Sequence, residues 1–311
     1  MAGRSVVLAY VESYAWTDLQ PFVRTLSASG YEGDVVFYTS DLPDSCTAHL
    51  SRNGIDQIPV RRLNLKGAYP YRNWLRGGRP ETFIPDISVN RRLSSFLDRL
   101  DLVDTGLGNW VARTFWHCQS ARFLYFREFL RSHPTYEQIL ICDVRDVAFQ
   151  APPFSEPTDD RLHVYEEYAQ VRLGEQANNA SWVESLYGRK GLERLQDFPI
   201  LCVGVLHGGR TAVIRAVDAI CREVVERYRG WGTDQGVFNY LVRTEQIGNV
   251  VVHSFGEGCA MHLGIAPRAA IPTDSQGRVL NRAEEVCAIV HQYDRHDDLS
   301  QSFLGRTTMA S

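Results

Sequence analysis

The sequence has no hydrophobic run long enough to cross a membrane and no large excess of charge of either sign. No stretch approaches the roughly 20 apolar residues of a membrane-spanning helix. The apolar run near the N-terminus is too short for the core of a secretion signal and is interrupted by Glu12. With 33 basic and 37 acidic residues, the chain lacks the basic excess of a general nucleic-acid binder. We therefore expect a cytoplasmic protein that has no integral membrane segment and does not bind nucleic acid.

Repeats, linkers and paired cysteines are also missing. The seven cysteines are an odd number, none of them forms a C-x-x-C pair, and most fall in apolar segments. These features favour buried, reduced thiols over disulfides or a zinc site. A chain of 311 residues is long enough to bury a sizeable core. Because no internal repeat or linker divides it, we expect one domain over residues 1–311.

Short apolar segments alternate with amphipathic segments in the N-terminal part of the chain. The expected strands cover residues 6–11, 34–39 and 57–63, and the expected helices cover residues 18–29 and 44–53. Strands that alternate with helices of about ten residues pair in parallel and carry helices on both faces of the sheet. This pattern predicts an α/β fold with a mostly parallel sheet.

The alternation continues after one irregular segment. Lys66 to Pro85 is crowded with proline, glycine, arginine and aromatic residues, which predicts a long functional loop. The alternative is a surface loop whose aromatic side chains pack into a small satellite cluster. Beyond it, we expect helices over residues 109–131, 211–224 and 232–241, the second capped by Thr211, and strands over residues 138–142, 162–165, 199–206, 250–255 and 286–290.

Two carboxylates follow the apolar strand at residues 138–142. Asp143 and Asp146 stand where that strand ends, and ligands of open α/β sheets collect just beyond the carboxyl ends of their strands. Carboxylate oxygens suit Mg²⁺ or Mn²⁺, and either cation neutralises phosphate oxygens. The alternative is a turn with two solvated aspartates. Side chains three positions apart on a strand face opposite ways, so the chain must turn at Val144 and Arg145 for both carboxylates to converge.

Two other polar elements stand at similar places in the sequence. Asp234 lies in Gly-Thr-Asp-Gln at the start of an expected helix, and His291 ends the last expected strand, followed by Asp294. Together with Gly-Tyr-Glu-Gly-Asp-Val-Val at 30–36, Asp-Val-Arg-Asp at 143–146 and His-Gln-Tyr-Asp-Arg at 291–295, these motifs cover most of the chain in a characteristic order. In that order the sequence resembles the GT-A class of nucleotide-sugar-dependent glycosyltransferases.

The resemblance implies a GT-A fold, with a Rossmann-like, mostly parallel mixed sheet, and a metal-dependent transferase. Its donor would be a nucleoside-diphosphate sugar and its acceptor a hydroxyl group of an unidentified molecule. Carried over residue by residue, the resemblance makes Asp146 a direct ligand of Mn²⁺ or Mg²⁺. Asp143 becomes a ribose-binding or water-mediated partner in the metal site, and His291 becomes the third protein element there.

The chemistry of this reaction also needs charged groups around the diphosphate. Arg122, on the helix before the aspartate strand, and Arg295, after His291, are candidates for binding it, and the alternative for each is a solvated surface arginine. Asp234 is the candidate catalytic carboxylate on the acceptor side, unless it only caps the helix near Gly236. Glu166 and Glu167, which follow another expected strand, are reserve candidates for this role, although a strand-end glutamate is more often solvated.

Two other functional classes fit parts of the pattern. A phosphohydrolase of the haloacid dehalogenase type also has an apolar strand followed by two aspartates, but its pair is separated by one residue and lies near the N-terminus. A non-catalytic protein that binds nucleotide sugars or carbohydrates could share the same fold, because fold does not determine function. The four residues Asp143, Asp146, Asp234 and His291 favour the enzyme over such a binding protein.

Overall fold

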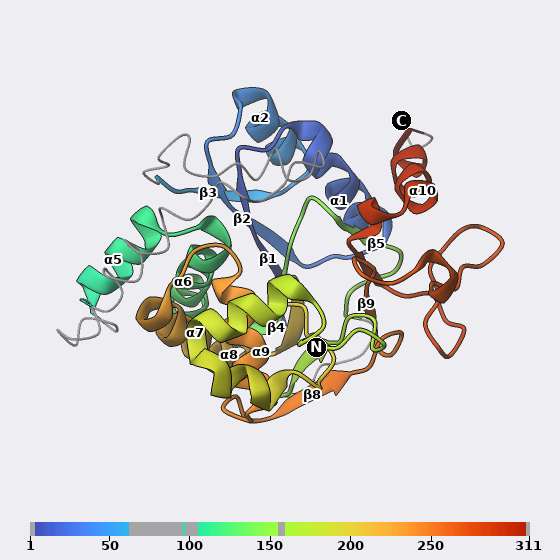
Figure 1. Ribbon diagram of the computed structural model, residues 1–311. Coiled ribbons are helices and arrows are strands. Elements are labelled where there is room, and N and C mark those ends of the chain that lie inside the picture. The colour runs from blue at the N-terminus through green and yellow to red at the C-terminus, as the bar shows by residue number, and fades with distance from the viewer. Residues whose placement is uncertain (1–3, 62–95, 97–104, 155–158, 309–311) are drawn as a thin grey trace.

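The structure is a computed structural model that describes residues 4–61, 96, 105–154 and 159–308 (Figure 1). The elements that form the main sheet and its helices follow in the order β1 Arg4–Glu12, α1 Trp16–Ala28, β2 Asp34–Ser40, α2 Asp44–Arg52, β3 Asp56–Pro59, α5 Gly106–Phe115, α6 Cys118–Ser132, β4 Tyr136–Cys142, β6 Leu162–Tyr165, α7 Ala177–Leu195, β7 Val205–Gly209, α8 Arg210–Arg227, α9 Thr233–Arg243 and β8 Val250–His253. The expected loop from Lys66 to Pro85 lies outside the described residues.

Seven strands form the main sheet in the order β3-β2-β1-β4-β7-β6-β8. All neighbouring strands are parallel except that β7 runs antiparallel to β4 and to β6. A smaller sheet combines β5 Val147–Phe149, β10 Ile289–His291 and β9 Ala260–His262 in the order β5-β10-β9. The chain ends with the short helices η1 Arg268–Ala270 and η2 Tyr293–Arg295 and with α10 Asp297–Thr308. The prediction of a mostly parallel, mixed α/β sheet is confirmed.

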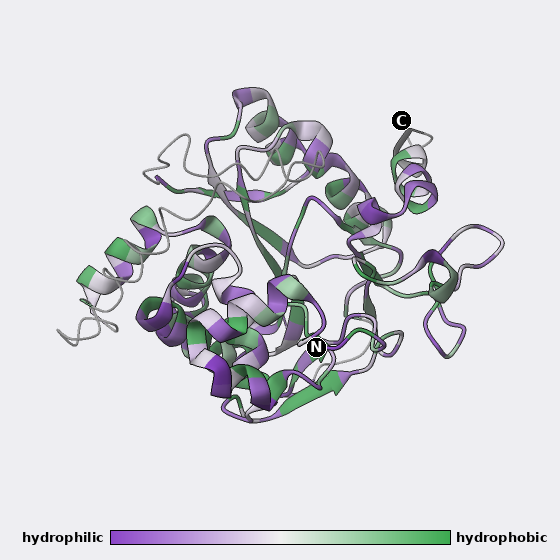
Figure 2. Cartoon of the chain, in the orientation of Figure 1, coloured by the Kyte–Doolittle hydropathy of each residue, from purple (hydrophilic) through white to green (hydrophobic). Residues whose placement is uncertain are grey.

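Helices cover both faces of the main sheet, as expected. On β1, the alternate residues Val6 and Leu8 pack into a core with α6, α8 and α9, whereas Val7 and Ala9 pack into a second core with α1 and α2. Figure 2 shows the central strands in green over most of their length and the helices with alternating green and purple positions. No helix among the described residues is long and apolar enough to span a membrane. That residues 1–311 form one domain stays a prediction.

The expected long helix over residues 109–131 is two helices, which corrects the sequence prediction. Trp116 ends α5 in an extended conformation, with φ −87° and ψ 160°, and His117 caps α6 by accepting a hydrogen bond from the backbone N–H of Gln119. The indole of Trp116 is fully buried and stacks on Tyr228 at a centroid distance of 4.5 Å. This packing against a residue more than a hundred positions away breaks the helix.

The strand expected at residues 199–206 is displaced towards the C-terminus. The ladder of β7 runs from Val205 to Gly209, while the segment before it makes isolated bridges, Leu201 with Glu166 and Pro199 with Arg172. Gly208 permits this ladder, because a side chain there would begin 2.1 Å from the backbone oxygen of Arg161. The next helix consequently begins at Arg210 with Gly209 as its N-cap, so the prediction of Thr211 as the cap is wrong.

Candidate active site

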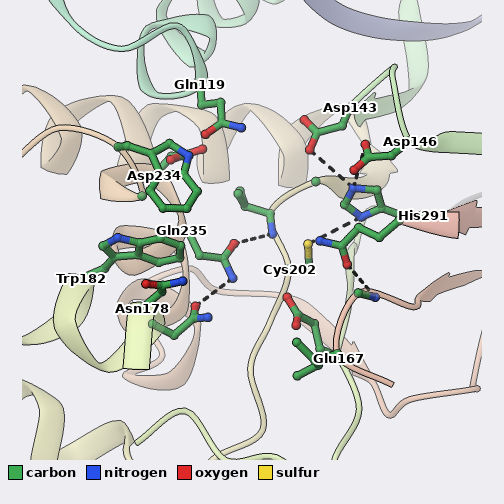
Figure 3. A pocket seen from close by; sticks show the side chains of 18 of the residues that line it. Gln119, Asp143, Asp146, Glu167, Asn178, Trp182, Cys202, Asp234, Gln235 and His291 are labelled. Atoms are coloured by element: carbon green, nitrogen blue, oxygen red, sulfur yellow. Dashed lines mark hydrogen bonds and ion pairs between the residues drawn. The ribbon is translucent and has the colours of Figure 1, made fainter. Parts of the chain in front are cut away.

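A cavity of about 200 Å³ opens where the carboxyl end of β4, the segment before β7, the start of α9, α7 and the end of β10 meet. All the residues assigned to the site from the sequence line this cavity. They are Arg122, Asp143, Asp146, Asp234, His291 and Arg295. Figure 3 shows that the cavity has two sides. Asp143, Asp146 and His291 lie on one side, and Asp234, Gln119, Trp182 and Asn178 lie on the other.

The first side forms because the chain turns where the sequence requires it. After β4 ends at Cys142, a turn brings the chain back into β5, and the backbone N–H of Val147 donates to the oxygen of Val144. The pairing of β5 with β10 then sets His291 opposite Val147, beside Asp146. As a result, His291 Nε2 lies 3.5 Å from Asp143 Oδ2 and also 3.5 Å from Asp146 Oδ1. The expected turn and the convergence of both carboxylates are thus found.

The geometry of these three residues fits a divalent cation. The candidate ligand atoms of Asp143, Asp146 and His291 all lie within 4.8 Å of one another. His291 Nε2 is buried and has no hydrogen-bond partner in the described part of the chain, although it points between two carboxylates. Gly204 leaves the space open, because a Cβ atom there would lie 2.2 Å from the imidazole of His291 and 2.8 Å from Asp143 Oδ2. Two hard oxygen ligands and one imidazole suit Mn²⁺ better than Mg²⁺.

The other nitrogen of His291 faces a second buried imidazole. His262, on β9, is paired with His291 across the small sheet, and the two Nδ1 atoms lie 2.8 Å apart. Cys202 Sγ lies 3.6 Å from the same Nδ1 atom of His291. A hydrogen bond from Nδ1 of His291 to His262 leaves the lone pair of Nε2 directed at the carboxylates. Sequence reasoning missed His262, because β9, the strand that it ends, is only three residues long and gives no apolar run in the sequence.

A buried arginine links the two sides of the cavity. Arg122, on α6, donates from Nη1 to Asp143 Oδ1, and its Nη2 lies 3.6 Å from Asp234 Oδ2. Burial alone would raise the pKa of Asp143, but Arg122 and His291 outweigh burial and hold it well below its usual range. The same two carboxylates outweigh the burial of Arg122 and raise the pKa of its guanidinium. Arg122 therefore carries a permanent positive charge at the centre of the site.

Arg295 lies at the rim of the same side. Its Nη2 is 3.8 Å from Asp146 Oδ2, and its Nη1 donates to Asp294 Oδ2 at 2.6 Å. Arg145, from the turn between the two aspartates, also contacts Asp294, at 3.2 Å. Two guanidinium groups thus border the carboxylate cluster on its partly exposed side. Of the two, Arg295 lines the cavity.

Asp234 lies in the first turn of α9 rather than ahead of it. The helix begins at Thr233, after Gly232, which takes the left-handed conformation at φ 82°. Only 2% of Asp234 is exposed, and its buried Oδ1 atom accepts no hydrogen bond from the residues that the structure describes. Burial raises the pKa of Asp234, with Asp143 adding to the rise and Arg122 opposing it. The helix does not begin near Gly236, which lies inside α9. The alternative that Asp234 only caps a helix beginning there is therefore wrong.

The two strand-end glutamates are buried, in contrast to the solvated position expected for them. Glu166 is paired with Arg243 at 2.7 Å. Glu167 lines the cavity, and burial raises its pKa to about 7, with His291 and a hydrogen bond from Cys202 opposing the rise. Sequence reasoning also missed Gln119, Asn178, Trp182 and Trp231, which line the second side. Glutamine, asparagine and tryptophan scattered over three segments give no periodic signal that would connect them.

Known proteins resemble this chain in structure rather than in sequence. No protein-family model and no curated protein matches the sequence. Among solved structures, the apo form of the bifunctional glycosyltransferase WbbM is 10% identical over 97% of this chain, with a TM-score of 0.51. The chain spans 50% of the WbbM chain.

Two further solved structures cover nearly all of both chains. The galactosyltransferase LgtC, in complex with donor and acceptor sugar analogs, is 14% identical over 98% of this chain and 94% of its own, with a TM-score of 0.47. A glycosyltransferase involved in glycosylation of the major capsid of PBCV-1 is 11% identical over 96% of this chain and 99% of its own, with a TM-score of 0.43. Of these three structures, WbbM has a TM-score above 0.5, and its likeness to this chain is a likeness of fold. With its seven-stranded mixed sheet and helices on both faces, the chain has the GT-A fold of the glycosyltransferases.

Proposed function

We propose that this protein is a metal-dependent glycosyltransferase that moves a sugar from a nucleoside-diphosphate sugar to a hydroxyl group of an acceptor. One observation carries the proposal. Asp143, Asp146 and the unpartnered Nε2 atom of His291 converge at one side of a cavity, and Arg122 connects them to the buried carboxylate of Asp234. The GT-A fold supports the proposal, because ligands of open α/β sheets collect in the crevice beyond the carboxyl ends of the strands.

The reaction needs groups that stabilise a departing diphosphate. The bond between the anomeric carbon and a diphosphate oxygen breaks, and its electron pair leaves with the diphosphate. A bond forms between the anomeric carbon and the acceptor oxygen, whose proton passes to a carboxylate or phosphate oxygen of the site. A divalent cation held by Asp143, Asp146 and His291 would supply positive charge next to that leaving group. Arg122 and Arg295 border the same carboxylates and add fixed positive charge without reorganisation.

Asp234 is the carboxylate best placed to act on the sugar or the acceptor. It lies across the cavity from His291 and Asp146 and has a free Oδ1 atom that accepts no hydrogen bond within the described residues. A carboxylate in this position can receive the hydroxyl proton of an acceptor, as inverting transfer requires. It can equally hold a sugar hydroxyl in place, as retaining transfer requires. In both cases its role is separate from binding of the nucleotide.

The test is nucleotide binding with and without a cation. Calorimetry with UDP and GDP in Mn²⁺, in Mg²⁺ and in EDTA should show binding only with a cation present. Unchanged affinity after chelation would contradict the metal assignment. Sugar release from nucleoside-diphosphate sugars, followed by chromatography, then separates the enzyme from a non-catalytic binding protein. Hydrolysis of simple phosphate monoesters instead would favour the phosphohydrolase.

A further inference from the structure

The side of the cavity opposite the metal ligands is built from aromatic rings. Trp182, on α7, and Trp231, in the turn before α9, meet edge to face with ring centroids 4.7 Å apart and an angle of 87°. The indole of Trp182 lies directly on Gly232, where a Cβ atom would come within 2.2 Å of the ring. The left-handed conformation of Gly232 and this contact both require glycine. The backbone at the start of α9 thus fixes the position of the Trp182 ring.

Polar groups without partners surround these rings. The side-chain amides of Gln119 and Asn178 line the cavity, and neither makes a hydrogen bond to any described part of the chain. Asp234 contributes its unpartnered Oδ1 atom to the same side. Figure 3 shows Gln119 above Asp234 and Asn178 beside Trp182. Two amides and a carboxylate oxygen therefore offer donors and acceptors around an aromatic surface.

This combination matches the chemistry of a pyranose ring. A sugar ring has a face of C–H bonds that packs on an indole and a rim of hydroxyl groups that pair with amides and carboxylates. Binding sites combine such apolar surfaces with a few placed polar groups that fix orientation. Tryptophan is well suited to this role, because it supplies a large rigid surface and keeps one polar edge.

The position of these groups distinguishes the acceptor from the donor. The sugar of the donor is bonded to the diphosphate, so it must lie next to Asp143 and Asp146. Arg122 lies between Asp143 and Asp234, so Asp234 is farther from the diphosphate. Trp182 lies farther away still, against Gly232. We propose that Trp182, Trp231, Gln119 and Asn178 form a binding site for a saccharide acceptor. This inference rests on the proposed function and names its acceptor class.

Binding of simple glycosides tests the inference directly. The probes are methyl α- and β-glycosides of glucose, galactose and mannose, measured by saturation-transfer NMR and tryptophan fluorescence with UDP and Mn²⁺ present. At least one of them should bind. Asn178→Ala should weaken its affinity at least about fivefold, and because the side chain of Asn178 has no hydrogen-bond partner among the described residues, the fold should be unaffected. Trp182→Phe should have a similar effect, with UDP affinity unchanged within about twofold.

The matched control is Trp110→Phe, because Trp110 is 56% exposed on α5 and does not line the cavity. It should bind UDP and the glycoside as the unaltered protein does. If UDP binds but none of the six glycosides does, or if Asn178→Ala and Trp182→Phe bind glycosides normally, the acceptor site is wrong and the proposed function stands. A loss of UDP affinity in Trp182→Phe would make the ring a nucleotide contact instead. If no nucleotide binds under any condition, the proposed function itself fails.

Discussion

Two groups of buried imidazoles lie in neighbouring parts of the molecule and differ in what faces them. His291 faces Asp143 and Asp146; burial alone would lower its pKa, but Cys202 and these carboxylates raise it well above the usual range. His207, on β7, stacks on His163 at 4.9 Å and accepts or donates a hydrogen bond with Tyr165. Burial, together with a smaller contribution from neighbouring imidazoles, lowers the pKa of His207 to about 3. The same side chain thus holds its proton tightly where carboxylates converge on it and resists protonation where only imidazoles and a phenol face it.

The largest expected effect comes from removing one carboxylate of the first group. Asp146→Asn keeps the size of the side chain but loses the charge that faces His291 Nε2 at 3.5 Å. We expect its UDP affinity in Mn²⁺, measured by calorimetry, to fall by more than the roughly 100-fold that loss of an outer metal-site partner costs. Asp44→Asn, at an exposed position of α2, is the control. Equal affinities of Asp146→Asn and the control would remove Asp146 from the metal site.

Asp234→Asn should separate catalysis from nucleotide binding. The amide cannot take a proton, so turnover should fall roughly 100-fold, the usual scale for a general acid or base. The affinity for UDP in Mn²⁺ should stay nearly the same, because no ligand atom of the metal site changes. Initial rates of sugar release and calorimetry on the same preparation provide both measurements. A folded variant with normal turnover would reduce Asp234 to a structural residue of α9.

The metal side of the cavity could be predicted from the sequence because its residues stand at strand ends. Asp143 and Asp146 follow an apolar strand, and His291 ends another, so one regularity indicates all three. Their convergence depends on the small sheet, because β10 pairs antiparallel with β5, the strand that follows the two aspartates, and not with β4. Their roles as metal ligands stay predictions. His262 is different, since it is recognisable only after the small sheet pairs it with His291.

The parts of the fold that the sequence did not predict depend on distant contacts. The break at Trp116 needs the ring of Tyr228 to stack on, and the ladder of β7 needs Gly208 to approach Arg161. Neither contact can be predicted from the periodicity of apolar residues, because that pattern indicates only which face of a segment is apolar. The N-terminal alternation was predicted well, since the strands and helices there pair with their immediate neighbours in sequence.

His262 offers a smaller test, because it would act on a bound cation only through His291. His262→Leu removes the acceptor 2.8 Å from His291 Nδ1, and we expect Mn²⁺ affinity to fall between 10-fold and 100-fold. His262→Asn should restore part of it, because its amide oxygen can accept the same hydrogen bond. Calorimetry with Mn²⁺ and nitrogen NMR of the His291 ring measure both. A normal affinity in the folded leucine variant would show that His262 only packs in the small sheet.

The second group of imidazoles should affect folding stability at acidic pH rather than metal binding. The pKa of His207 is about 3 in the folded protein, against an ordinary value of 6.5 in the unfolded chain. Above pH 6.5 both states are neutral at this residue, so it contributes nothing to the pH dependence. As pH falls below 6.5, only the unfolded state takes up the proton, and folding is penalised. Between pH 7 and pH 5 this penalty reaches about 2 kcal/mol.

Urea unfolding at pH 7 and at pH 5 measures this loss of stability. The comparison is His207→Gln, whose amide can still pair with Tyr165. Glu167 changes the stability with the opposite sign, because burial raises its pKa to about 7 and its ionisation on the way from pH 5 to pH 7 favours unfolding. Glu167 is present in both proteins, so its effect cancels in their difference. On acidification the unaltered protein should therefore lose about 2 kcal/mol more stability than His207→Gln. The control His133→Gln, at an exposed position, should lose as much stability as the unaltered protein. Parallel pH profiles for His207→Gln and the unaltered protein would mean that His207 is protonated as easily as an exposed histidine, and the contrast between the two imidazole groups would be lost.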